Sequence, residues 1–167
     1  MRTLRSAAVF LFTAISVPLA AQQQQQAQNR WAEPKCDLKP NDRLVNQGVL
    51  YLKNATTGKF EDQKKKDLSD AQRVLAQALT TGGQEKNPAA WYYLARYYII
   101  TNDAQGIDSA FTHAEQLKPD CKGDIDIWRR YVWVPTFNAG IAAWQANNLD
   151  SAIASFRRAS GQVRDRG

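Results

Sequence analysis

The sequence is poor in the residues that most often carry out chemistry. Its 167 residues include one histidine, two cysteines and one methionine. This set falls short of the four well-spaced ligands that a structural zinc site needs, and no C-x-x-C pair is present for redox catalysis. The sequence also lacks a glycine-rich phosphate loop, a G-x-S-x-G motif and an H-E-x-x-H motif. We therefore expect no metal, no cofactor and no enzymatic activity.

The remaining candidates for catalysis are isolated from one another. No nucleophile or carboxylate stands at a spacing that would hold His113, so we interpret it as a solvated side chain. Asp124 and Asp126 are two positions apart, so on a helix they would point in different directions. We expect them to mark the start of a helix, where acidic groups suit the helix dipole.

The sequence also has only a small excess of positive charge. The formal net charge is +6, and it falls to +4 (20 basic against 16 acidic residues) without Arg2 and Arg5 of the predicted signal peptide. The basic residues form short clusters, at residues 64–66, 129–130 and 157–158 and at Arg164 and Arg166. None of these clusters is a long basic stripe interleaved with aromatic residues on one helix face, and short runs are usually solvated surface, so we predict no nucleic-acid partner.

Long hydrophobic runs are absent except at the N-terminus. Two arginines precede an apolar run over residues 7–17, then Pro18 and small residues, which is the layout of a secretory signal peptide. The run is too short to cross a bilayer comfortably. We predict a signal peptide over residues 1–21, cleaved near Ala21, and an exported protein of the periplasm or extracellular space without a membrane span. The alternative is an N-terminal core helix.

Residues 22–40 are rich in glutamine and alanine and poor in apolar side chains, so we predict a flexible leader before a helical domain over residues 41–167. An even number of cysteines in an oxidising compartment favours pairing, here of Cys36 with Cys121. Such a bridge closes a long loop and would contribute about 4–5 kcal/mol by the loop-entropy estimate. Two separate buried thiols are the alternative.

From Asn41 onward, apolar residues recur at spacings of three and four, and no alternation is long enough for a strand, so the chain is predicted to be all-α. Helix boundaries are predicted at residues 81–83, 87–88, 102–103, 118–120 and 147–148. The resulting helices form pairs with a small residue in each member, which allows close approach. These residues are Gly48 and Ala71, Ala95 and Ala110, and Gly140 and Ala152.

The middle pair resembles a tetratricopeptide repeat. The pattern of that family is roughly W-x2-L-G-x2-Y, then A-x3-F, a further alanine and a closing proline, over about 34 residues. The matching residues are Trp91, Leu94, Ala95, Tyr98, Phe111, Ala114 and Pro119. Ile107 departs from the pattern, because alanine is usual there, and its bulk would splay the pair slightly.

Weaker copies flank the middle pair. The earlier copy has Leu44, Gly48, Tyr51, Ala71, Leu75 and Ala78, and the later one has Gly140, Ala152, Phe156 and Ala159. The later copy departs at Thr136, Ala143 and Arg164, and an extra segment over residues 121–135, expected to add a turn or two of helix, precedes it. The resemblance covers residues 41–161 and implies stacked antiparallel helical hairpins, a TPR-like right-handed α-solenoid of about three repeats. The chain is then a short protein with a polar tail or a piece of a longer array.

The resemblance also implies a concave groove beside the hairpin core. Its lining residues would be Tyr92, Arg96, Ile99, Phe137, Asn138, Ile141 and Trp144, extended at the front by Val45, Val49 and Leu52. An aromatic and apolar groove with one arginine suits an extended or helical peptide. The alternative is that the N-terminal segment or the extra helix covers these residues.

These expectations together favour a non-enzymatic protein–protein interaction scaffold that binds a protein or peptide through this groove. The alternative is a permanent accessory subunit of an envelope assembly or secretion complex, in which the hairpins pack on a larger body. Neither reading names the partner, because a fold alone does not specify function.

Overall fold

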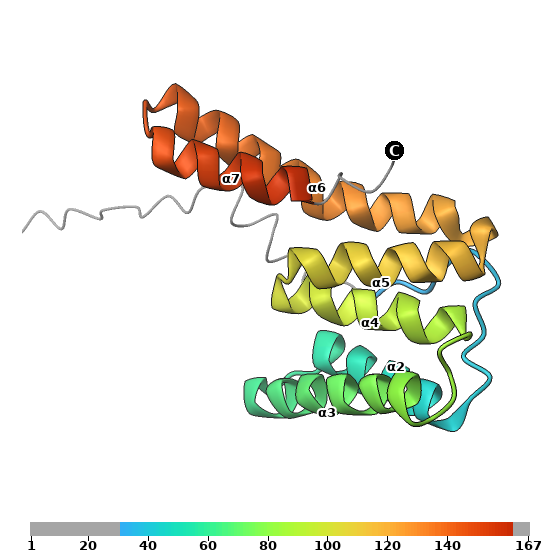
Figure 1. Cartoon of the computed structure of the whole chain (residues 1–167). Coiled ribbons are helices and arrows are strands. Elements are labelled where there is room, and N and C mark those ends of the chain that lie inside the picture. The colour runs from blue at the N-terminus through green and yellow to red at the C-terminus, as the bar shows by residue number, and fades with distance from the viewer. Residues whose placement is uncertain (1–30, 162–167) are drawn as a thin grey trace, which may run out of the picture.

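A computed structural model describes residues 31–161 of the chain (Figure 1). The predicted signal peptide, residues 22–30 of the leader, and Arg164 and Arg166 lie outside this range. Within it the elements are six α-helices and a short 3-10 helix, with no strand, so the all-α prediction is confirmed. The elements are α2 (Arg43–Thr57), α3 (Glu61–Thr80), α4 (Pro88–Thr101), α5 (Ala104–Leu117), η1 (Pro119–Cys121), α6 (Lys122–Gln145) and α7 (Leu149–Gly161).

Polar side chains at the helix ends determine where these helices begin and stop. Asp42 caps α2 by accepting from the backbone N–H groups of Leu44 and Val45 at 2.8 and 3.0 Å. Asn87 caps α4 and Asp103 caps α5 in the same way. Asn102 closes α4 in the left-handed conformation, with φ of 57°. The predicted boundaries after residues 80, 101 and 117 are confirmed.

The helices pair as three hairpins stacked in layers (Figure 1). The first hairpin is α2 with α3, the middle hairpin is α4 with α5, and the last hairpin is the C-terminal half of α6 with α7. Helices α2 and α3 both pack on α4, while the N-terminal half of α6 lies on α5. The last hairpin therefore projects past the other two.

The extra segment expected before Pro135 is not a separate turn or two of helix. It is the first half of α6, which continues through Pro135 to Gln145 as one 24-residue helix. Proline lacks an N–H group, so it removes one bond of the helix ladder but does not end the helix here. The longer helix is what carries the last hairpin beyond the middle one.

The same close contact recurs in all three hairpins. A Cβ atom added to Gly48 of α2 would lie 2.5 Å from Cγ of Leu75 on α3, and one on Gly140 of α6 would lie 2.6 Å from Cε1 of Phe156 on α7. The middle hairpin reverses the roles, since Gly106 of α5 lies under the ring of Tyr98 on α4. In each hairpin the glycine has no side chain at this contact, so the two helices approach each other closely.

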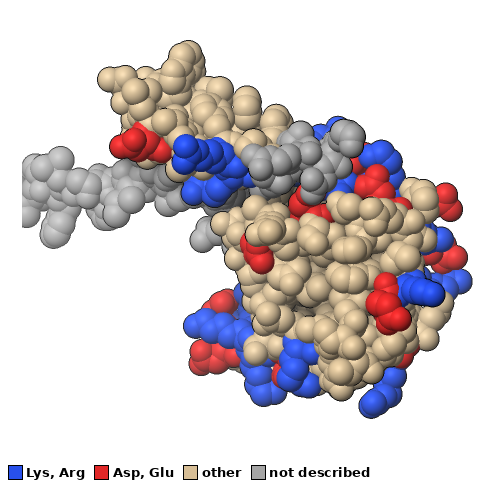
Figure 2. Space-filling view, in the orientation of Figure 1, with Lys and Arg blue, Asp and Glu red and all other residues tan. Residues whose placement is uncertain are grey.

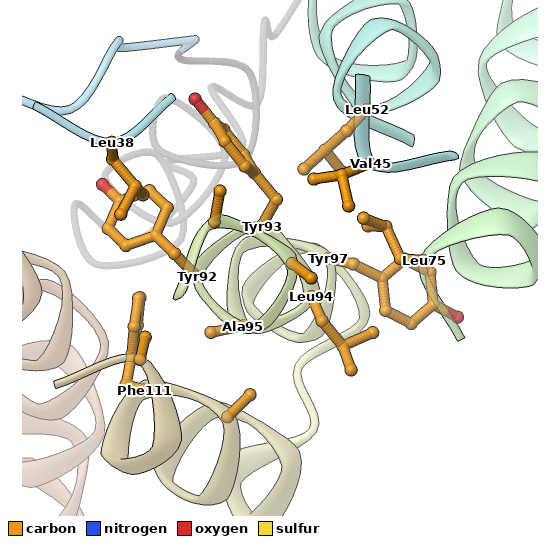
Figure 3. Close-up of a cluster of buried hydrophobic side chains, with 14 of the residues drawn as sticks. Leu38, Val45, Leu52, Leu75, Tyr92, Tyr93, Leu94, Ala95, Tyr97 and Phe111 are labelled. Carbon is orange, nitrogen blue, oxygen red and sulfur yellow. The ribbon is translucent and has the colours of Figure 1, made fainter. Parts of the chain in front are cut away.

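The main core surrounds α4, which lies at its centre (Figure 3). Val45, Leu52 and Leu75 of the first hairpin approach it from one side, and Phe111 of α5 approaches from another. The predicted core residues Leu94, Ala95 and Ala114 are also buried here, while Gly140, Ala152 and Ala159 are buried in the last hairpin, where Phe156 is half-buried.

Pro119 differs from the prediction that it belongs to the core, while Trp91 and Tyr98 are partly buried and pack against the core. Trp91 is half-buried at the surface, where its Nε1 donates to the carbonyl of Glu85 at 2.8 Å and its ring stacks on His113 with centroids 4.3 Å apart. Pro119 is exposed at the start of η1. The neighbouring Tyr92 occupies the fully buried place instead, because α4 has neighbours on nearly every side.

Residues 31–40, here called the strap, differ from the flexible leader that composition predicted. The strap runs from the middle hairpin along the stack to α2 (Figure 1). Leu38 is buried in the main core, and Asn87 Nδ2 donates to the carbonyl of Pro40 at 2.8 Å. Cys36 forms a disulfide with Cys121, as predicted, across a sequence separation of 85. The packed part of the chain therefore begins at least ten residues before Asn41.

The glycine contacts give a test with a matched control. Gly48→Ala should lower the free energy of unfolding by about 1–3 kcal/mol, because the new methyl group meets the fully buried Leu75. Gly123→Ala, also within a helix but with no atom within 4 Å of the new Cβ, should be neutral or stabilise by up to about 1 kcal/mol. Urea denaturation measures both, and equal effects at the two sites would contradict the close-approach account.

The disulfide gives a second prediction. Replacing both Cys36 and Cys121 with serine should lower the free energy of unfolding by up to about 4–5 kcal/mol, because the unfolded chain regains the freedom of a long loop. Thermal denaturation of the oxidised wild type and of the variant measures the loss. Reductant should lower the midpoint of the wild type and leave that of the variant unchanged; the absence of this difference would argue against the bridge.

Candidate functional site

The groove residues predicted on α4 are not open to solvent. Tyr92, Arg96 and Ile99 expose 0%, 4% and 8% of their surface. The strap and the N-terminal half of α6 cover this face, which is the alternative that the sequence left open. Val45 and Leu52, the expected extension of the groove at the front, are also buried in the core. The middle part of the groove is therefore already occupied by the chain itself.

Arg96 lies at the centre of the covered face and contacts two indole rings. Its guanidinium carbon is 3.6 Å from the ring centroid of Trp128 on α6 and 5.4 Å from that of Trp31 in the strap. Its Nη1 donates to the backbone carbonyl of Ala32 at 3.0 Å. A buried guanidinium is costly, and these cation–π contacts and the charge-assisted hydrogen bond offset that cost.

Tyrosine side chains complete this cluster. The Nε1 of Trp128 donates to the hydroxyl of Tyr92 at 3.0 Å, and the ring of Trp31 lies parallel to that of Tyr93 with centroids 6.0 Å apart. We call Tyr92, Tyr93, Arg96 and Trp128 the Arg96 cluster. Burial raises the pKa of Tyr92 and Tyr93 and lowers the pKa of Arg96, because each charged form is poorly solvated there.

The strap is attached at several further points. The backbone N–H of Cys36 donates to Oδ2 of Asp124 at 2.7 Å, next to the disulfide. On α2, Lys53 Nζ lies 3.8 Å from Oε1 of Glu33 and 6.0 Å from the ring centroid of Trp31. The predicted helix start at Asp124 is confirmed, and its carboxylate has the additional role of holding the strap.

A second cluster of charges joins α5 to α6. Arg129 is buried, and its guanidinium pairs with Glu115 and lies 3.5 Å from Asp108, while Nη2 donates to Thr112 at 3.0 Å. This arginine belongs to one of the short basic runs of the sequence. Its partners are all within the chain, so Arg129 supports packing between the two helices.

The predicted groove residues on the last hairpin are accessible. Phe137 and Ile141 are half-buried, Asn138 is exposed and Trp144 exposes 61% of its surface. Phe137 lies between Trp133 and Phe156, with centroids 4.8 and 5.5 Å away. Residues 131–149 contain no charged side chain, and Figure 2 shows the projecting hairpin as largely uncharged surface. The structure thus divides the predicted groove into a covered part and an open part.

No group of three or more histidine, cysteine, aspartate or glutamate side chains stands close enough to hold a metal ion within residues 31–161. His113 is exposed and stacks on Trp91. No helix in the described range is long and apolar enough to span a membrane.

Comparison with known proteins gives no relative. No protein family, no curated protein and no solved structure matches the chain.

The sequence reasoning missed Trp31, Trp128 and Tyr93 as members of one cluster. They lie on the strap, α6 and α4, and no periodicity links positions so far apart. The one feature of the sequence that could have indicated this cluster was the pair of cysteines. A bridge from Cys36 to Cys121 necessarily draws residues near 31–36 toward the start of α6, where Trp128 lies two turns on.

The buried tyrosines predict a loss of stability in alkali. Above pH 10 the unfolded chain releases the Tyr93 proton while the folded chain keeps it, so the unfolded state binds fewer protons and stability falls as pH rises. The loss is about 1 kcal/mol for this tyrosine at pH 11. Denaturation of Tyr93→Phe at pH 8 and pH 11 should show a smaller difference than the wild type; an equal difference would mean that Tyr93 ionises freely when folded.

Proposed function

We propose that this protein is a non-enzymatic protein–protein interaction scaffold of the cell envelope or the secreted space, and that its partner binds the last hairpin. The observation that carries this proposal is Trp144, which exposes 61% of its surface on a hairpin that projects from the stack. Exposed tryptophan is costly in water and is a frequent centre of binding energy in protein interfaces.

Other exposed apolar side chains on the last hairpin support this proposal. Val134, Leu149 and Ile153 are large apolar side chains that are also at least 40% exposed on the same hairpin. Exposed apolar residues gathered in one region mark interaction sites more often than single ones do. Residues 131–149 carry no charge, so a partner could cover this region without desolvating an ion.

Because the Arg96 cluster is covered, we place the proposed partner site on the last hairpin and not on the middle one. In a TPR-like scaffold the concave side of the stack would bind the partner. Of the residues predicted for that side, Phe137, Asn138, Ile141 and Trp144 are accessible. The buried disulfide supports an exported location, because such bridges persist in oxidising compartments.

A permanent accessory subunit is the second candidate function. The same exposed apolar side chains favour it, since the interfaces of permanent complexes are larger and more hydrophobic than those of transient ones. A stoichiometric complex that survives high salt during purification from the native host would support this candidate. A complex that dissociates on dilution would support the transient scaffold.

Site-specific crosslinking tests the proposed surface. A photoreactive amino acid at Asn138, exposed on α6 six residues before Trp144, should give a defined crosslinked product in the native host, identified by mass spectrometry. The same group at Gln72, exposed on α3 of the first hairpin, should not. Products of equal yield at both positions would contradict a partner site on the last hairpin.

The contribution of Trp144 can be measured once the crosslinked partner is identified. Trp144→Ala should weaken binding at least about tenfold, because interface tryptophans often contribute 2 kcal/mol or more. Phe60→Ala is the matched control, since Phe60 exposes 77% of its surface but lies in the turn between α2 and α3. Equal losses in the two variants would show that exposed aromatic residues act non-specifically.

A further inference from the structure

The first residues of the strap lie on the Arg96 cluster much as a bound peptide lies on a receptor. The ring of Trp31 stacks on Tyr93 and contacts Arg96, and the carbonyl of the next residue, Ala32, accepts from Arg96 Nη1. Glu33 follows and lies near Lys53 of α2. One ring, one backbone carbonyl and one carboxylate in an extended run are the contacts of peptide recognition in a groove.

The residues of the Arg96 cluster also contact one another, so the cluster stays assembled without the strap. Trp128 hydrogen-bonds to Tyr92, and Arg96 lies on the ring of Trp128 at 3.6 Å, and none of these three residues belongs to the strap. Phe111 supports Tyr92 from behind, with centroids 5.6 Å apart. The cluster is thus held by α4, α5 and α6.

The first three strap residues are also held less firmly than the rest. Cys36 is fixed by the disulfide and by Asp124, and Leu38 is buried in the core. Residues 31–33 are held by ring contacts of Trp31, which packs at the edge of the core, by a hydrogen bond to Arg96 and by an ion pair of 3.8 Å between exposed groups, which is worth little. They can therefore leave the cluster while Cys36 and Leu38 keep the remainder of the strap in place.

We propose that the Arg96 cluster is a peptide-binding site and that residues 31–33 of the strap are its intramolecular competitor. The ligand is an extended segment of a partner protein with an aromatic residue, then a small residue, then an acidic residue. This site is separate from the surface around Trp144 and does not rest on the function proposed for that surface.

The chemistry of the cluster sets these ligand preferences. The planar guanidinium of Arg96 and the ring of Tyr93 favour an aromatic side chain, and Arg96 Nη1 needs a carbonyl one residue later. A small residue there keeps the backbone close to α4, and Lys53 favours an acidic third residue. The strap competes because its tether gives it an effective concentration in the millimolar range.

Fluorescence anisotropy with the full chain tests the proposal. The probe is the peptide acetyl-Trp-Ala-Glu-Pro-Lys, the sequence of residues 31–35, labelled on its lysine. The Trp31→Ala chain should bind it at least about tenfold more tightly than the wild type, because the competing ring is gone. A peptide with alanine in place of tryptophan should not bind either chain. Equal affinity of the wild type and Trp31→Ala for the probe would overturn the proposal.

Two further variants separate this site from the alternatives. In the Trp31→Ala background, Arg96→Lys keeps the charge but loses the planar stacking, so it should weaken the peptide at least about tenfold, while circular dichroism and the thermal midpoint check that the variant is folded. Trp144→Ala should leave peptide affinity unchanged, which distinguishes this site from the last hairpin. An unchanged affinity in folded Arg96→Lys would overturn the site.

The remaining alternative is that the occupant comes from a second copy of this chain by exchange of straps. Light scattering on the wild type distinguishes the two sources. A monomer supports a partner protein as the source of the segment. A dimer that the peptide dissociates would show that the strap of a second copy is the ligand and would overturn the assignment to a different protein.

Discussion

Arg96 joins three segments that are far apart in the sequence. Its guanidinium lies against Trp128 of α6 and Trp31 of the strap, and its hydrogen bond to Ala32 fixes the position of the strap backbone. A buried guanidinium is tolerated only where such partners surround it, since an unpaired buried charge costs several kcal/mol. Both the strap and the first half of α6 help to satisfy this charge, and the disulfide ties the strap covalently to the segment just before α6.

The stack itself is built from a simpler repeated contact. A glycine in one helix of each hairpin lies under a large side chain of the other, which is Leu75, Tyr98 or Phe156. The first and middle hairpins then bury their remaining apolar faces against each other and against α6. The last hairpin has few such neighbours among the described residues, so its apolar side chains, with Trp144 foremost, remain at the surface.

The predicted groove therefore has two parts with different access to solvent. The part on the last hairpin is open, uncharged and aromatic. The part on the middle hairpin is closed by the strap, whose first residues are attached more weakly than those after Cys36. Under the two proposals made above, one partner binds the last hairpin directly and another binds the Arg96 cluster only in competition with the protein's own N-terminal segment. The tether of the strap sets the strength of that competition.

The sequence by itself determined the pairing of the helices and the ends of α4 and α5, because capping residues such as Asn87 and Asp103 and spacings of three and four act within a few positions of each other. It also indicated the bridge between Cys36 and Cys121. Only the tertiary structure decided that Tyr92 and Arg96 are covered, that Trp91 stays near the surface, that α6 continues through Pro135 and that residues 31–40 are packed. These outcomes depend on contacts between residues tens of positions apart, such as Trp31 with Tyr93 and Trp128 with Tyr92, which leave no periodic trace in a single sequence.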